Sequence, residues 1–176
     1  EFRSQMTGDG ARPNLFSVTL IFPTNVVNGT AAGQKVTFMA KAAQLPGSTV
    51  GTVPVYYFGR ELKFAGNRTF PDWTITVIND EDFSIRNALE TWMNAINSHA
   101  GNLRNAQASN GTGYSVDATV TQYGKTGEAL KTYKFVGLFP LDIGAIDLDW
   151  GSNDSIEEYP VTFAYQWWEA LDGTTT

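Results

Sequence analysis

Residues 59–80, GRELKFAGNRTFPDWTITVIND, decide the fold of this chain. The pattern predicts a strand, a tight turn and a second strand, because apolar and β-branched residues alternate with polar ones around turn-forming residues. The alternation is strictest in the second strand, where Trp73, Ile75 and Val77 share one face. The acidic residues that begin at Asp80 indicate the start of a helix. No catalytic group lies in a recognisable arrangement here, so the stretch informs on architecture.

The sequence on either side predicts further strands. A β-hairpin is expected at residues 50–65, with Phe58-Gly59-Arg60 near its turn. Other strands are expected at residues 15–22, 36–43, 74–78, 116–123, 130–136, 146–150 and 161–167. Residues 23–34 and 101–114 are rich in Asn and Gly, which predicts loops.

One helix is predicted after Asp80, Glu81 and Asp82, because acidic side chains favour the positive start of a helix. Gly101 is its expected stop. Such a helix is marginal alone in water, so we expect it to cover an open face or edge of the sheet. The fold class is therefore mainly β, an antiparallel β-sandwich or barrel with one flanking α-helix. The apolar stripe of the helix consists of Ile85, Ala88, Leu89, Trp92, Met93 and Ile96.

Composition limits the function classes. The 176 residues suit one domain, residues 1–176, with an extended arm at 1–13 and a polar tail at 170–176. The net charge of −6 argues against a nucleic-acid-binding protein, which needs a basic face for phosphates. Cysteine is absent and His99 is the single histidine, which excludes disulfides and multi-histidine metal sites. No apolar run suits a membrane span, and no cofactor is predicted.

Two acidic patterns could carry chemistry. Asp147, Asp149 and Glu158 have the spacing of calcium-loop ligands, but Ser152 stands where that loop requires Gly. We favour the polar side of a strand for the two aspartates. Asp72, with Glu81 and Asp82, could form a glycosidase carboxylate pair, but acidic residues before a helix are usually caps.

Two other patterns concern a histidine and a pair of tryptophans. A triad using His99 lacks the Gly-x-Ser-x-Gly elbow, and we interpret His99 as a surface residue. Trp167 and Trp168 could form a sugar-stacking platform. Strand alternation places Trp167 with the apolar face of Val161, Phe163 and Tyr165, which leaves Trp168 opposite, and an interface is favoured over a ligand site for the exposed ring.

Several separate blocks of the chain resemble the tail tube protein of contractile-tailed, T4-like bacteriophages. They are residues 59–80, Ala-Arg-Pro-Asn-Leu-Phe at 11–16, Gly-Leu-Phe-Pro at 137–140 and Leu-Asp-Trp-Gly-Ser-Asn at 148–153. The likeness runs from about Arg12 to Glu169 and keeps the family's order. The chain departs from the family in a longer segment at 24–35 and in the residues after Glu169.

The resemblance implies a structural virion protein and no enzyme. Such proteins form hexameric rings that stack into a hollow tube, inside a contractile sheath, through which the genome leaves. The implied partners are further copies of the chain, the tail sheath protein, and the baseplate and tail terminator proteins. Genomic DNA would pass through the lumen without specific binding. The implied location is the virion tail, with assembly in the host cytoplasm. The family's fold is shared with the type VI secretion tube protein.

The resemblance also implies where the contacts lie. The hairpin region would reach the next ring, with Pro46, Gly47, Val53, Tyr56, Tyr57 and Arg60 as candidate inter-ring contacts. An acidic lumen would repel phosphate, and Asp117, Asp147 and Asp149 are the candidates on polar strand faces. The alternatives are a tube-like baseplate component, a secretion-system tube protein, and a carbohydrate-binding β-sandwich that uses Trp168. A glycoside hydrolase is the least favoured.

Overall fold

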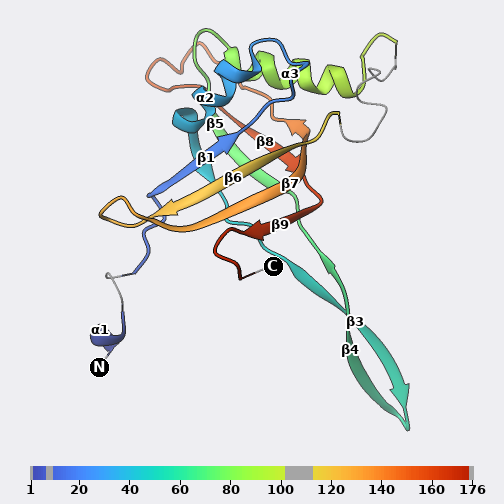
Figure 1. Cartoon of the computed structure of the whole chain (residues 1–176). Helices are drawn as coiled ribbons and strands as arrows, with labels where there is room; N and C mark the ends of the chain where they lie inside the picture. Colours follow the sequence, from blue (N-terminus) through green and yellow to red (C-terminus); the bar gives the residue numbers. More distant parts are fainter. Residues whose placement is uncertain (1, 7–9, 102–112, 175–176) are drawn as a thin grey trace.

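The computed structural model describes residues 2–6, 10–101 and 113–174. Within them the chain is mainly β, as predicted, and α2 and α3 lie at one end of the strands, whereas α1 lies apart near the N-terminus (Figure 1). The helices are α1 (Phe2–Gln5), α2 (Gly29–Met39) and α3 (Ser84–Ile96). The strands are β1 (Phe16–Leu20), β2 (Ala40–Ala43), β3 (Thr49–Tyr57), β4 (Arg60–Thr69), β5 (Trp73–Ile78), β6 (Val116–Tyr123), β7 (Ala129–Ile143), β8 (Glu158–Ala164) and β9 (Trp167–Ala170).

Strand β7 joins two layers of one antiparallel sheet. The strands run in the order β1-β6-β7-β8-β5-β2, and β9 pairs with β7. The first part of β7 pairs with β6 and β9, whereas its last residues pair with β8. Just before the pairing changes to β8, Gly137 has a φ of +68°, which a residue with a Cβ rarely adopts. The register also shifts between Pro140 and Asp142. These irregularities bend β7 from one layer into the other.

The core lies between the two layers and is aromatic. The alternation predicted for β5 is confirmed, since Trp73, Ile75 and Val77 are buried and the threonines between them are not. Trp73 stacks on Phe135 of the opposite layer, with 4.3 Å between ring centroids. Burial of such side chains supplies most of the driving force for folding. The largest fully buried side chains are Trp73, Trp92, Tyr159, Phe135 and Phe163.

The predicted helix is confirmed as α3, and its apolar stripe covers the core. Ile85, Leu89 and Trp92 are buried, and the helix contacts α2 and β7. The N-cap residue is Phe83, which makes no side-chain cap bond, but one residue earlier Asp82 Oδ1 accepts the Ser84 N–H at 3.0 Å. The helix ends at Ile96, five residues earlier than the predicted stop at Gly101.

Helix α2 corrects the sequence analysis, which predicted a loop at residues 23–34 and a strand at 36–43. Ala32 and Val36 are buried against the body, so tertiary packing overrides the poor helix propensity of this glycine-containing segment. Gly33 permits the close approach: a Cβ there would lie 2.6 Å from the Leu20 carbonyl oxygen. Only β2 remains of the predicted strand.

One further strand and two strand ends were also predicted wrongly. Residues 146–150 are not a strand but part of the connection between β7 and β8. The strand expected at 130–136 continues to Ile143, and the strand expected at 161–167 stops at Ala164. The predicted extended arm contains the helical turn α1. No helix among the described residues is long and apolar enough to cross a membrane.

Candidate assembly surfaces

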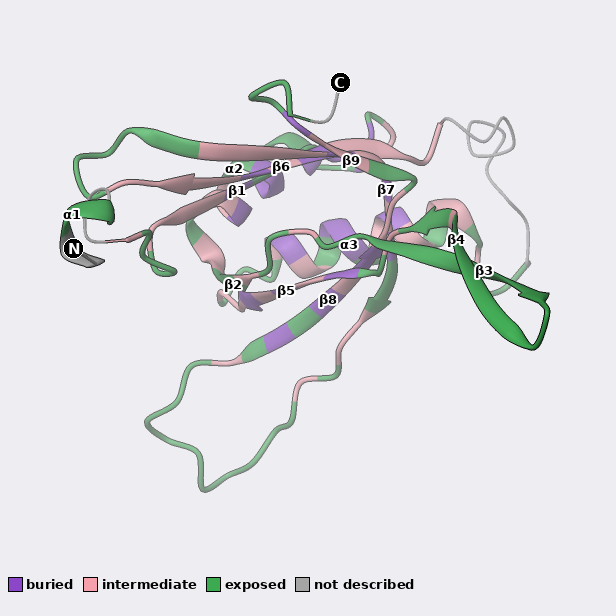
Figure 2. Cartoon of the chain, turned by 90° about the horizontal axis from the view of Figure 1, so that it is seen from below, coloured by how far each residue is buried: buried purple, intermediate pink, exposed green. Residues whose placement is uncertain are grey.

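The hairpin of β3 and β4 stands apart from the body (Figure 1). The two strands form their own sheet, from the pair Thr49 and Thr69 to the pair Tyr57 and Arg60. Phe58 and Gly59 make the turn with φ angles of 47° and 73°, a left-handed backbone that suits a two-residue hairpin. The predicted hairpin is therefore confirmed, and it is longer than residues 50–65. Figure 2 shows almost the whole ribbon as exposed.

This hairpin is apolar although it is exposed. Its large hydrophobic side chains have exposed fractions from 45% for Val55 to 88% for Phe58. An isolated two-stranded ribbon is marginal in water, and exposed apolar patches usually mark interfaces. The hairpin is therefore the strongest candidate contact surface. The side chains are Val50, Val53, Val55, Tyr56, Tyr57, Phe58, Leu62 and Phe64.

The root of the hairpin is fixed to the body by indole groups. The Nε1–H of Trp73 donates to the Gln44 carbonyl at 2.8 Å, and that of Trp168 donates to the Gly47 carbonyl at 2.9 Å. On the other root segment, the Phe70 ring packs against Trp168, with ring centroids 6.4 Å apart. The body therefore sets the direction of the ribbon from both of its connections.

The structure divides the predicted inter-ring residues between root and ribbon. Pro46 and Gly47 lie in the root, and the Gly47 carbonyl is held by the Trp168 indole. Val53, Tyr56, Tyr57 and Arg60 lie on the ribbon, and Tyr57 pairs with Arg60 beside the turn. The sequence analysis omitted Phe58, Leu62 and Phe64, although the alternation of Leu62 and Phe64 in β4 was visible in the sequence.

The predicted lumen residues lie in two different places. Asp117 is on β6, where its carboxylate lies 2.9 Å from the Lys134 ammonium on β7. The pKa of Lys134 is raised by its hydrogen bond to Asp117. Asp147 and Asp149 are not on a strand face, contrary to expectation, but in the connection of residues 144–157. There Asp149 Oδ1 accepts the Gly151 N–H at 3.1 Å.

The lysines on the seven-stranded sheet all face carboxylates. Lys41 lies 2.6 Å from Glu158, and Lys131 lies 3.1 Å from Asp172. With Lys134 bound to Asp117, the sheet presents no lysine without a nearby counter-charge. Threonines also lie on the sheet, including the hydrogen-bonded pair Thr121 and Thr132. Such faces offer little to attract a polyanion.

The calcium-loop pattern and the glycosidase carboxylate pattern of the sequence do not form such sites in the described structure. Among the described residues no three potential metal ligands gather, and Glu158 of the calcium-like pattern is engaged by Lys41. In the carboxylate pattern, Asp82 lies 2.5 Å from Lys35, and this hydrogen bond lowers the pKa of Asp82 to about 2. A glycosidase general acid needs the opposite shift.

The two tryptophans exchange the places that strand alternation predicted. Trp168 packs on the body, with its ring edge-on to Tyr133 at 5.3 Å between centroids, and it fixes the hairpin root. Trp167 has 45% of its surface exposed, and its indole donates to Glu169 at 2.9 Å. The reason is a break in the strand at residues 165–166, which changes the phase of the alternation. A flat platform of two rings is therefore absent.

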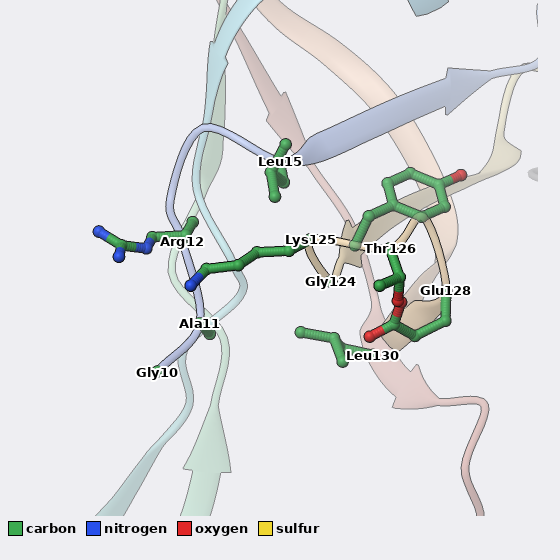
Figure 3. A pocket seen from close by; sticks show the side chains of 10 residues that line it. Gly10, Ala11, Arg12, Leu15, Gly124, Lys125, Thr126, Glu128 and Leu130 are labelled. Atoms are coloured by element: carbon green, nitrogen blue, oxygen red, sulfur yellow. The ribbon is translucent and has the colours of Figure 1, made fainter. Parts of the chain in front are cut away.

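A cavity of about 390 Å³ lies where the N-terminal segment meets the turn between β6 and β7 (Figure 3). Arg12 and Lys125 extend along one side, and Thr126 and Glu128 lie on the other. The Thr126 hydroxyl donates to Glu128, and this bond lowers the pKa of that carboxyl group. This bond joins residues two apart in one exposed turn, and it is the interaction that orders the Glu128 side of the lining.

Comparison with known proteins gives a consistent picture. A family model described as "Phage tail tube protein" matches residues 11–171. The tail tube protein of Enterobacteria phage T4 is 34% identical over 168 residues, which are 95% of this chain and 96% of the relative.

Two solved assemblies contain chains of the same fold. One is the anti-feeding prophage tube terminating cap, with a TM-score of 0.66, 18% identity, and coverage of 92% of this chain and 90% of the other. The second is the sheath-tube complex of the PVC extracellular contractile injection system in its extended state, with a TM-score of 0.60, 15% identity and 97% of both chains covered.

Proposed function

Because this chain belongs to the phage tail tube protein family, a family of structural and not enzymatic proteins, we propose that six copies close into a ring and that the rings stack into the inner tube of a contractile tail. Phage DNA passes through this tube to the host. The protein therefore acts as part of the virion tail, after assembly in the host cytoplasm. The identity to a phage tail tube protein favours this function over a secretion-system or baseplate tube component.

The observation that carries the proposal is the hairpin of β3 and β4. It projects from the body with an apolar surface that the rest of the described chain leaves uncovered. A ribbon of this kind gains stability when it packs on another subunit. We assign it to the contact between rings, with Val53, Tyr56, Tyr57 and Arg60 on the contacting surface and Pro46 and Gly47 at its base.

Open sheet edges support closure within a ring. Strands β1 and β2 end the path of the seven-stranded sheet, and β9 lies at its branch. The outer backbone groups of an edge strand are a template for pairing with another chain. If each copy contributes four strands, six copies make a barrel roughly 40–50 Å across, which leaves room for duplex DNA.

DNA can pass through the lumen only if the lumen wall does not bind its phosphates. The pairing of Lys41, Lys131 and Lys134 with carboxylates supports such a wall on either outer face of the sheet. Asp117 keeps its proposed place on a sheet face, where it also neutralises Lys134. Asp147 and Asp149 lie in the loop of residues 144–157, so they would line the lumen only if this loop faces it.

The external partners follow from the same architecture. We propose that the outside of the tube contacts a tail sheath protein and that its two ends contact baseplate and terminator proteins. The fold likeness to chains in a sheath-tube complex and in a terminating cap supports these partners.

Negative-stain electron microscopy of the purified protein tests the function. We expect rings or long cylinders composed of this chain alone. A compact monomer that persists at high concentration, with no ring in any condition, would overturn the proposal. Retention on a polysaccharide column would instead support the carbohydrate-binding alternative.

A further inference from the structure

The loop of residues 144–157 is a second exposed apolar surface. It connects β7 to β8 and runs away from the body in Figure 2. Leu148 has 83% of its surface exposed, Ile156 has 71%, and Trp150 is fully exposed. Tryptophan is among the residues that contribute most to protein interfaces when they become buried. Three large apolar side chains on one loop therefore indicate a contact surface.

Hydrogen bonds to the body fix both ends of this loop, whereas its middle projects away from the body. At its start, the Arg86 guanidinium donates to the Gly144 carbonyl at 3.1 Å. At its end, Asn79 donates its side-chain amide to the Glu157 carboxylate at 2.8 Å, and its backbone N–H to the Glu157 carbonyl at 2.8 Å. Helix α3 and the end of β5 thus fix where the loop leaves the molecule.

Charge distinguishes this loop from the hairpin. The loop contains Asp147, Asp149, Asp154 and Glu157 and no basic residue. None of these four carboxylates forms a salt bridge within the described part of the chain. The loop is therefore both apolar and negatively charged.

The hairpin has the opposite charge. It contains Arg60, Lys63 and Arg68 against a single acid, Glu61. Its three cations likewise lack salt bridges among residues 2–6, 10–101 and 113–174. An apolar basic ribbon and an apolar acidic loop are complementary in both hydrophobicity and charge.

The two surfaces lie at opposite ends of one sheet layer. Strand β5 begins at Trp73 beside the hairpin root and ends at Ile78, and Ile78 pairs with Glu158 directly after the loop. The hairpin accordingly leaves one end of the layer and the loop leaves the other (Figure 1). A copy stacked head-to-tail on another would bring its hairpin toward the loop of its neighbour. Different surfaces on the two partners give a heterologous contact, which can repeat without limit.

We propose that the acidic loop 144–157 is the receiving surface for the hairpin of a second copy in the adjacent ring. This inference rests on the proposed function, because it names the partner of the inter-ring hairpin. Trp150, Leu148 and Ile156 provide the apolar floor. The carboxylates around them select the basic ribbon and set its register.

A charge-exchange experiment tests this pairing. One variant carries Asp147→Lys and Asp149→Lys, a second carries Arg60→Glu and Lys63→Glu, and a third carries all four changes. A control with Glu81→Lys and Glu128→Lys changes the net charge by the same amount as the loop variant, before α3 and on the β6–β7 turn. Tube length and the concentration at which tubes appear are measured by electron microscopy and light scattering, and circular dichroism checks folding.

We expect each two-residue exchange in the loop or the hairpin to raise the concentration needed for tubes by roughly tenfold, while the control assembles normally. The four-residue variant should recover most of the loss, because opposite charges again face each other. Normal tubes from the loop variant would overturn the inference but leave the proposed function intact, and so would a folded four-residue variant that does not recover. Absence of rings in the unmodified protein would instead overturn the proposed function.

Discussion

Lys35 on α2 links two helices through a pair of carboxylates. Its ammonium lies 2.5 Å from Asp80 and 2.5 Å from Asp82, which precede α3. The hydrogen bonds to these carboxylates raise the pKa of Lys35, and the bond from Lys35 lowers the pKa of both aspartates. The bridge therefore stabilises the folded chain only while the carboxylates are ionised.

We predict that Lys35→Met lowers the melting temperature near neutral pH by a few degrees. A carboxylate with a lowered pKa contributes stability above its unfolded value, and the contribution is lost as pH falls through the folded value. The difference between variant and parent should thus shrink between pH 3.8 and about 2. Thermal unfolding followed by circular dichroism over a pH series measures it. A difference that stays constant down to pH 2 would show that the bridge is not its cause.

Trp168 is predicted to orient the hairpin rather than to bind a ligand. Trp168→Phe keeps an aromatic ring in the body but removes the N–H that donates to Gly47. Loss of one such bond costs about 1 kcal/mol, so the chain should stay folded. The hairpin root should loosen, and trypsin should cut faster after Arg60, Lys63 and Arg68 on the hairpin in the unassembled protein. Mass spectrometry of the fragments identifies the cut sites, and an unchanged cleavage rate would argue against this role.

At the scale of elements, β5, α3 and the hairpin were predictable because the periodicity of their apolar residues and the turn residues are visible in their own sequences. Strict alternation fixes β5, and a single apolar stripe fixes α3. Helix α2 was missed because its helical form depends on burial of Ala32 and Val36 and on close packing at Gly33. These contacts come from distant parts of the chain. Residues 146–150 of the loop were predicted as a strand for a related reason. Their apolar and polar residues alternate as in a strand, but no described strand pairs with them.

The hairpin leads to a prediction about assembly without loss of folding. Tyr57 is 64% exposed, and its ring contacts Phe58 beside the turn. Tyr57→Asp should therefore leave the melting temperature almost unchanged. It should shorten tubes and release rings, because a carboxylate would be buried between subunits. Electron microscopy and thermal unfolding give both results, with Asn87→Asp at an exposed position of α3 as the control away from the ribbon. Full-length tubes from the Tyr57 variant would remove this residue from the contact.

For the whole molecule, charge balance makes a prediction about DNA. Asp117→Asn combined with Glu158→Gln leaves Lys134 and Lys41 without their carboxylate partners. Tubes of this variant should bind duplex DNA at low salt and release it as salt rises, whereas parent tubes should show negligible binding. Exposed surface pairs of this kind contribute little to stability, so folding should be retained. Salt titrations of DNA binding by fluorescence anisotropy test this, and equal binding by parent and variant would contradict it.

Strand β7 has a mechanical consequence for an assembled tube. The continuous backbone of β7 is hydrogen-bonded into both layers of the body. The layers therefore cannot separate unless the pairing of β7 with its neighbours is broken. The body should therefore respond to load as a stiff unit. Compliance is then confined to the slender ribbon and its root, and a tube would bend at the joints between its rings while each ring keeps its bore.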